Sequence, residues 1–201
     1  MIKNIIFDLG NVLLNFKPEE FLLRYTQDGK LIKKFISKVI RSRIWLKLDR
    51  GTLSVQKARE EFLSRFPEDS HLIISYFDHW MEMLTPIQNN VRILRDLKMK
   101  GYKLYILSNF IEEAFNYVCN KYDFFSLFDG GIISCRIHII KPEIEIFKKI
   151  IEKFNLDPEE CLFIDDVATF LFKARKFKIK TIQYLPYTDL REELRNLNID
   201  V

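Results

Sequence analysis

Cysteine is scarce in this sequence, which contains only Cys119, Cys135 and Cys161. These residues are odd in number, far apart and outside any CxxC pattern, which argues against a disulfide framework and against a structural zinc site. We expect reduced thiols in a cytoplasmic protein.

Long apolar runs are also missing. The first apolar stretch, residues 2–7, is too short for a secretory signal and ends in an acid. No segment reaches the length of about 18 apolar residues that suggests a membrane-spanning helix. We therefore expect no membrane partner and a cytoplasmic location.

Neither sign of charge is in large excess. The chain has 32 Lys and Arg against 28 Asp and Glu, a net charge of +4. Its basic clusters, Lys33-Lys34 and Arg41-Ser42-Arg43, are typical of a solvated helix surface, and no nucleic-acid recognition motif accompanies them. We expect no nucleic-acid partner.

Hydrophobic residues, by contrast, make up 48% of the 201 residues, which is typical of one globular domain that can carry an insertion.

Five short apolar runs have the composition of buried strands. They are residues 2–7, 103–107, 131–134, 161–164 and 180–184. Segments of helical period lie between the later runs: residues 91–100, 112–121, 142–154 and 170–177. We expect the third helix to begin at Pro142. Strands that alternate with helices predict an α/β fold with a parallel sheet.

One long stretch interrupts this alternation. Residues 18–84 contain helical patterns and no convincing strand, and Ser54 can cap one of the helices. We therefore predict a helical insertion over residues 16–85, between a first core segment of residues 1–15 and a second of residues 86–201. Trp45, Tyr76 and Trp80 are candidates for lining a pocket there, although aromatic residues on helices are more often core residues.

Polar residues follow four of the five predicted strands. They are Asp8 with Gly10 and Asn11, Ser108 with Asn109, Lys141, and Asp165 with Asp166. Each alone has an ordinary explanation as a helix cap, a turn or a solvated loop residue. Because the carboxyl ends of parallel strands share one edge of a sheet, we expect the four groups to meet.

The chemistry of such a cluster is coherent. Carboxylates that repel each other favour a hard cation between them, and oxygen ligands beside a phosphate suit Mg²⁺. Ser108, Asn109 and Lys141 would hold the phosphate oxygens. A carboxylate aimed at phosphorus can form an aspartyl-phosphate, whose transition state the cation and Lys141 would stabilise.

These residues resemble the four motifs of the haloacid dehalogenase superfamily. The resembling segments are Ile5-Ile6-Phe7-Asp8-Leu9-Gly10-Asn11-Val12-Leu13, Leu107-Ser108-Asn109, Lys141-Pro142-Glu143-x-x-Ile146-Phe147 and Phe163-Ile164-Asp165-Asp166. The resemblance implies a Rossmann-like parallel-sheet core, and it identifies the insertion as an α-helical cap. Arg50-Gly51-Thr52-Leu53-Ser54 is similar to the Arg-Gly turn of such caps.

The resemblance also implies roles for these residues. Asp8 would be the nucleophile and a metal ligand, and the Gly10 carbonyl, Asp165 and Asp166 would complete a Mg²⁺ site. Ser108, Asn109 and Lys141 would bind the phosphoryl group. The first motif is especially similar to a subgroup of sugar-phosphate phosphatases that includes glucose-1-phosphate phosphatase.

Three positions depart from the family pattern. The commonest phosphatases of the family carry an acid/base Asp at the position of Gly10, and losing such a group typically lowers the rate by a factor of ~10²–10⁴. The only histidines are His71, His79 and His138; a cap histidine could reach the site on closure, although a lone histidine is more often a surface or packed residue. Phe170 replaces a frequent Asn, and Lys178 stands where a glycine usually ends a helix.

Several functions remain compatible with the sequence. We expect a phosphatase for a small phosphorylated metabolite, acting as a monomer or a homodimer. The alternatives are a catalytically weak or silent binding protein, a metal-independent 2-haloacid dehalogenase and a phosphomutase. The Asp165-Asp166 pair argues against the dehalogenase, because two carboxylates would repel its carboxylate substrate. The absence of an acid/base residue at Gly10 argues against the phosphomutase.

Overall fold

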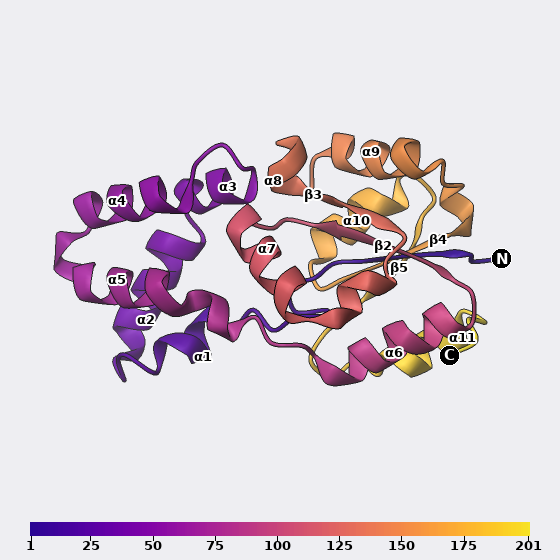
Figure 1. The fold of residues 1–201 in the computed structure, drawn as a ribbon, viewed down its shortest axis with the longest axis horizontal. Coiled ribbons are helices and arrows are strands. Elements are labelled where there is room, and N and C mark those ends of the chain that lie inside the picture. Colours follow the sequence, from indigo (N-terminus) through magenta and orange to yellow (C-terminus); the bar gives the residue numbers. More distant parts are fainter.

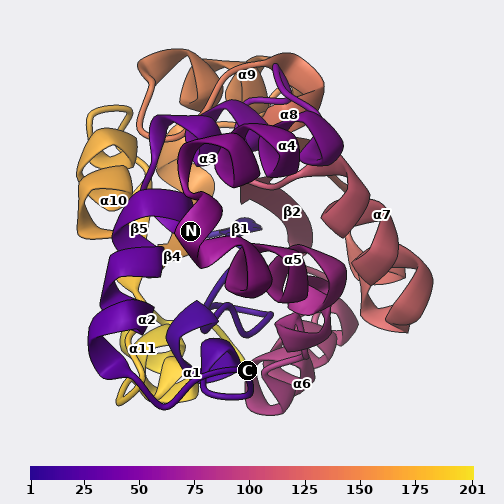
Figure 2. The same cartoon turned by 90° about the vertical axis from the view of Figure 1, so that its left-hand side faces the viewer.

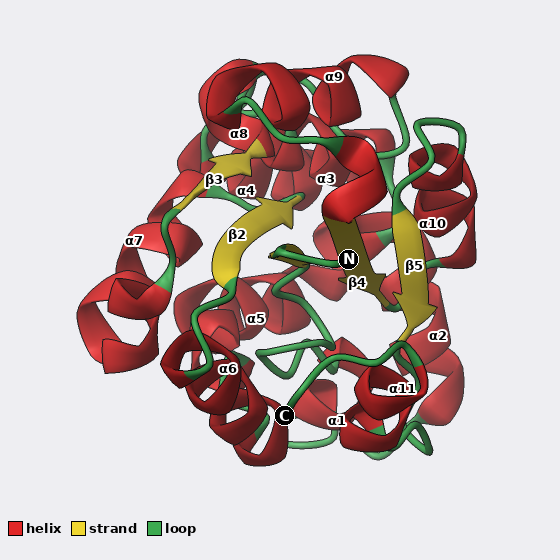
Figure 3. Cartoon of the chain, turned by 90° about the vertical axis from the view of Figure 1, so that its right-hand side faces the viewer, coloured by secondary structure: helices red, strands yellow, loops and turns green.

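The computed structural model describes all residues from 1 to 201, and its centre is a five-stranded parallel sheet. The strands are β1 (Asn4–Phe7), β2 (Lys103–Ser108), β3 (Gly130–Ile133), β4 (Cys161–Asp165) and β5 (Lys180–Gln183), in the order β3-β2-β1-β4-β5. All neighbouring pairs are parallel, so the carboxyl ends of all five strands point to the same edge. The central strand β1 ends immediately before Asp8. Figure 3 shows β2, β3, β4 and β5 with helices around them.

Helices cover both faces of the sheet because both faces of its strands are apolar. Ile5 and Phe7 join the larger core, which includes residues of α6 (Gln88–Met99), α7 (Glu112–Lys121) and α11 (Leu190–Asn196). Ile6, on the other face, packs with α9 (Ile144–Phe154) and α10 (Ala168–Arg175). Full burial of such a side chain contributes about 1.5–3 kcal/mol. The sheet is therefore held as the middle layer of three.

The insertion between β1 and α6 is helical, as predicted. Its helices are α1 (Pro18–Leu22), α2 (Gly29–Phe35), α3 (Arg43–Asp49), α4 (Val55–Arg65) and α5 (Ser70–His79). A π-helical turn, Ile36–Ile40, continues α2. These helices gather at one end of the molecule, next to the carboxyl ends of the strands, and both chain termini lie at the opposite end (Figure 1). Figure 2 views the molecule from the side of this cap.

The cap has its own aromatic centre. Tyr76 is fully buried, and its ring lies 5.1 Å from Phe35, 6.2 Å from Trp45 and 6.4 Å from Trp80. The candidate pocket residues Trp45, Tyr76 and Trp80 therefore pack inside the cap. The limits of the cap at residues 16 and 85 stay a prediction.

Local signals explain most boundaries. Ser54 caps α4 as predicted, with its hydroxyl accepting a hydrogen bond from the Lys57 amide. The expected helix start at Pro142 is wrong: α9 begins at Ile144, and Pro142 lies in a turn after a cis peptide bond. This turn is closed by the Glu143 amide, which donates to the Ile140 carbonyl. None of the helices is both long enough and apolar enough to cross a bilayer.

Candidate active site

Asp8 follows the central strand directly and lies close to β4. Its amide donates to the Ile164 carbonyl at 2.9 Å, which extends the β1–β4 pairing by one residue. In this register Asp8 lies level with Asp165. The side chain of Asp8 is only 10% exposed, so the fold holds this carboxylate inside the protein at the edge of the sheet.

Three carboxylates meet at this edge. Oxygen atoms of Asp8, Asp165 and Asp166 all lie within 4.8 Å of one another. Burial, together with the charge of Asp8, raises the pKa of Asp166. Burial also raises the pKa of Asp165 to about 7, against the opposing effect of Lys141. The ionised forms of buried carboxylates that lie this close together are stabilised by a cation placed between them.

Lys141 supplies one positive charge to this cluster. Its ammonium nitrogen lies 2.6 Å from Asp165 Oδ2 and 3.0 Å from Asp8 Oδ1, and its side chain is 1% exposed. Burial alone lowers the pKa of Lys141, but the two carboxylates outweigh this and raise it, so the lysine stays protonated. When all three carboxylates are ionised, one ammonium leaves two negative charges, which a divalent cation would balance.

Two buried oxygen atoms in this region have no hydrogen-bond partner. They are Asp8 Oδ1, whose contact with Lys141 lacks hydrogen-bond geometry, and Ser108 Oγ. A buried polar atom without a partner costs about 1–3 kcal/mol. Ser108 is 1% exposed at the end of β2, so solvent does not satisfy its hydroxyl.

Asn109 makes a different contact from the one predicted. Its carboxamide donates to the Lys141 carbonyl at 3.0 Å and accepts from the Lys141 amide at 2.7 Å. This pair of hydrogen bonds fixes the backbone of Lys141 and so directs its side chain to the carboxylates. The proposed phosphate contact of Asn109 stays a prediction.

The turn after Asp8 is shaped by Asn11 rather than by Gly10. Asn11 has φ +53°, a left-handed conformation that Asn tolerates better than most residues. Its carboxamide donates to Asp166 Oδ2 at 3.2 Å and accepts from the Phe16 amide at 3.1 Å. At Gly10 an added Cβ would meet no atom within 4 Å, so a side chain would fit there although the sequence provides none.

Phe170, a departure from the family pattern, packs beside the site. The Lys141 ammonium lies 5.0 Å from the centre of the Phe170 ring and 5.4 Å from that of Phe163. These distances are typical of cation–π contacts, which favour the charged lysine.

Lys178 adopts φ +67°, the left-handed conformation that explains why glycine is usual there.

The histidines lie elsewhere. His79 pairs with Glu82 at 3.0 Å on the surface of the cap, and His71 is exposed. His138 Nδ1 lies 2.9 Å from the Arg50 carbonyl oxygen. None of the three forms a hydrogen bond or an ion pair with the carboxylate cluster, so the geometry gives no support to a histidine as the proton donor.

Asp49, the last residue of α3, was not recognised from the sequence. Burial and the charge of Asp8 raise its pKa to about 7, while Lys141 opposes the shift. The residue keeps some solvent contact, yet its carboxyl group is densely surrounded by protein. The only sequence signal for this position is the neighbouring Arg50-Gly51 turn.

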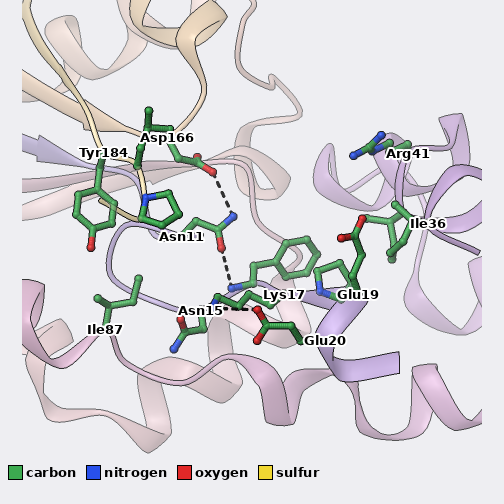
Figure 4. Close-up of a pocket in the computed structure, with 15 residues that line it drawn as sticks. Asn11, Asn15, Lys17, Glu19, Glu20, Ile36, Arg41, Ile87, Asp166 and Tyr184 are labelled. Carbon is green, nitrogen blue, oxygen red and sulfur yellow. Dashed lines mark hydrogen bonds and ion pairs between the residues drawn. The ribbon is translucent and has the colours of Figure 1, made fainter. Parts of the chain in front are cut away.

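A pocket of about 800 Å³ opens beside the cluster, between cap and core. Asn11, Asp166 and Tyr184 line it from the core, and Ile36 and Arg41 line it from the cap (Figure 4). Cavities of about 300–1,000 Å³ accommodate small ligands. The pocket gives a small molecule access to the edge of the carboxylate cluster.

Comparisons with known proteins agree with this architecture. The chain is 24% identical over 203 residues to a D-ribitol-5-phosphate phosphatase of Bacteroides thetaiotaomicron, covering 96% of this chain and 97% of that protein. It is 22% identical to the drimenol cyclase drtB of Aspergillus calidoustus over 98% of its own length, but it spans only 37% of that relative.

A solved structure is also similar. It is an enzyme of the haloacid dehalogenase family from Bacteroides thetaiotaomicron, in complex with magnesium and inorganic phosphate, and it superposes with a TM-score of 0.77 at 25% identity, covering 97% of this chain and 100% of that chain. The family profile described as haloacid dehalogenase-like hydrolase matches residues 2–169. The chain therefore belongs to the haloacid dehalogenase-like hydrolases.

Proposed function

We propose that this protein is a Mg²⁺-dependent phosphatase that hydrolyses a small phosphate monoester through an aspartyl-phosphate on Asp8. One observation carries the proposal: the carboxylates of Asp8, Asp165 and Asp166 converge, with the Lys141 ammonium 3.0 Å from Asp8 Oδ1. The two uncompensated negative charges fit a divalent cation, and oxygen donors suit Mg²⁺.

The residues divide into two groups in this proposal. Asp8, Asp165, Asp166 and the Gly10 carbonyl would hold the cation; Asp8 Oδ1, which is ion-paired with Lys141 but accepts no hydrogen bond, supports this donor set. Bound there, Mg²⁺ supplies charge neutralisation at the phosphoryl oxygens. Ser108, Asn109 and Lys141 bind the phosphoryl group; the unpartnered Ser108 Oγ supports this role for Ser108.

The reaction begins when the Asp8 carboxylate attacks phosphorus and the bond to the leaving oxygen breaks. Lys141 stabilises the charge that develops on the phosphoryl oxygens, because its ammonium is already fixed beside the nucleophile. Water then attacks phosphorus, the bond to Asp8 breaks and inorganic phosphate leaves.

The substrate class follows from the pocket and from one relative. The pocket of about 800 Å³ suits a small metabolite, and the similar D-ribitol-5-phosphate phosphatase is named for a sugar-alcohol phosphate. We propose a sugar phosphate or a similar small monoester. The glucose-1-phosphate subgroup and the cytoplasmic location stay predictions, as does the absence of a nucleic-acid partner.

The assay uses 4-nitrophenyl phosphate and then a panel of phosphorylated metabolites. We expect turnover with Mg²⁺, loss of turnover with EDTA, and loss in Asp8→Asn. Asp78→Asn, which changes an exposed aspartate of the cap, is the matched control and should behave as the parent protein. Tight binding of phosphorylated ligands without turnover on any of them would point to the silent binding protein.

The dehalogenase alternative is disfavoured by electrostatics. A 2-haloacid carries a carboxylate, and the cluster around Asp8 already sets three carboxylates against a single ammonium. The substrate would therefore be repelled from the nucleophile. Metal-independent halide release from 2-haloacids would nevertheless decide for that reaction.

A further inference from the structure

Asp49 is an acid beside the site that the proposed chemistry does not use. It lies at the end of α3 in the cap, remote in sequence from all four motifs. Its carboxylate forms no hydrogen bond and no ion pair, and its only hydrogen bond to another element uses its backbone carbonyl. The carboxylate of Asp49 is therefore free of protein partners and can meet a ligand or exchange a proton.

The backbone at Asp49 is held against the catalytic loops from two sides. The Ser134 hydroxyl donates to the Asp49 carbonyl and accepts from the Phe110 amide, which links α3 to the segment that carries Ser108. Arg50 donates to Glu143, two residues after Lys141. The side chain of Asp49 takes no part in these contacts. They fix the backbone at Asp49 and leave its carboxylate without a hydrogen bond.

Gly51 makes this close docking possible. It has φ +70°, and a Cβ there would lie 2.3 Å from the Cys135 carbonyl oxygen. Only glycine lets α3 end this close to the core at this point. The His138 ring adds a further contact, with Nδ1 2.9 Å from the Arg50 carbonyl oxygen.

The placement also separates Asp49 from the metal ligands. The group of carboxylates within 4.8 Å of one another contains Asp8, Asp165 and Asp166 but not Asp49, and no hydrogen bond joins Asp49 to any of them. Asp49 is nevertheless close enough for the charges of Asp8 and Lys141 to act on it. The hydrogen bonds of Ser134 and Arg50 place this end of α3 against the loops that follow Ser108 and Lys141, so Asp49 belongs to the cap side of the site and not to the sheet edge.

We infer that Asp49 is the catalytic acid and base of this protein and takes the place of the side chain absent at Gly10. This inference rests on the proposed phosphatase function. When Asp8 attacks phosphorus, the protonated Asp49 carboxyl gives its proton to the leaving oxygen as the phosphorus–oxygen bond breaks. Asp49 then accepts a proton from the water that attacks the aspartyl-phosphate, and the next cycle begins with Asp49 protonated again.

The test compares substrates with good and poor leaving groups. 4-Nitrophenolate leaves near neutral pH without being protonated, whereas the alkoxide of a sugar-alcohol phosphate requires a proton. In Asp49→Asn we expect kcat/KM to fall by ~10²-fold or more on D-ribitol 5-phosphate and by less than ~10-fold on 4-nitrophenyl phosphate. Equal losses on the two substrates, or no loss on either, would overturn the inference.

A second variant tests whether an aspartate at position 10 can replace Asp49 as the acid. Since a Cβ at Gly10 meets no atom within 4 Å, Gly10→Asp should be accommodated. We expect the double variant, Gly10→Asp with Asp49→Asn, to recover at least ~10-fold of the kcat/KM lost on D-ribitol 5-phosphate. No recovery in a folded double variant that retains activity on 4-nitrophenyl phosphate would count against an acid role.

Two controls separate this role from others. Mg²⁺ affinity, measured by calorimetry, should be unchanged in Asp49→Asn, and a weakened affinity would make Asp49 a metal-site residue instead. Asp78→Asn should show no dependence on the leaving group. If the parent protein hydrolyses neither substrate with Mg²⁺, the proposed function fails; if it hydrolyses both and Asp49→Asn shows no selective loss, only the inference about Asp49 fails.

Discussion

The buried ammonium of Lys141 gives the strongest prediction, because its removal affects both stability and chemistry. Lys141→Met keeps most of the apolar stem that packs against Phe163 and Phe170, so it isolates the loss of charge. Lys141→Ala removes the stem as well. Lys148, exposed on α9, provides the control variant Lys148→Met.

The expected magnitude follows from the distances. At 3.0 Å and an effective dielectric constant of about 20, the attraction between Lys141 and Asp8 is about 5 kcal/mol before desolvation is counted. Breaking a buried pair by removing one partner costs about 3–5 kcal/mol, because the other charge stays buried. For a protein of this size we expect the Tm to fall by about 10 °C without metal.

Magnesium should reverse part of this loss. In Lys141→Met three carboxylates remain without an ammonium, so the variant should bind Mg²⁺ more tightly and regain stability when it does. Turnover should still fall by ~10²-fold or more, since a fixed positive group beside the developing charge is gone.

Urea unfolding with and without Mg²⁺, calorimetry and steady-state kinetics measure these effects. Lys148→Met should match the parent protein in all three. The reasoning is refuted if Lys141→Met loses less than about 1 kcal/mol of metal-free stability, or if it keeps turnover within ~10-fold of the parent.

Three further predictions follow from single contacts. Ser108→Ala removes a buried hydroxyl that has no partner, so the free energy of unfolding should stay the same or rise while the KM for phosphate esters increases; a clear loss of stability would contradict this. Gly51→Ala places a methyl group against the Cys135 carbonyl at φ +70°, and should cost about 1–3 kcal/mol in urea unfolding; parent-like stability would show that the turn can shift. Burial opposes ionisation of Asp129, but its hydrogen bonds to two lysines and a backbone amide outweigh this and lower its pKa to about 2 from 3.8, so its stabilisation is present above pH 3.8 and is lost as the pH falls toward 2; Asp129→Asn should remove that part of the acid transition, and an unchanged acid profile would argue against it.

The strand ends were predictable because two local signals coincide there. Ile5, Ile6 and Phe7 are apolar on both faces, which is typical of a central parallel strand, and Asp8 interrupts the run at the point where the sheet ends. In β4, likewise, an apolar run is interrupted by Asp165 where the strand ends. All five predicted strands are confirmed within one or two residues of their expected ends.

The start of α9 was not predictable in the same way. Proline is favoured in the first turn of a helix, which made Pro142 the expected start. In the structure the backbone of Lys141 is held by the carboxamide of Asn109, and the chain completes a turn before α9 begins at Ile144. The deciding contact joins residues 32 positions apart, so no local pattern contains it.

The sequence by itself determined the order of strands and helices along the chain, the presence of a helical insertion after the first strand and the residues that could carry chemistry. These features depend on local periodicity and on the polar residues that end each apolar run, which are properties of neighbouring residues. The sequence also showed that the side chain usual at the position of Gly10 is absent.

Only the tertiary structure decided which polar groups meet and what each of them contacts. It directed Asn109 to the backbone of Lys141, placed Phe170 beside the ammonium and docked the end of α3, with Asp49, on Ser134. These outcomes depend on distances between segments far apart in the chain. Burial then sets the strength of each charge interaction, because the same carboxylate behaves differently in water and inside the protein.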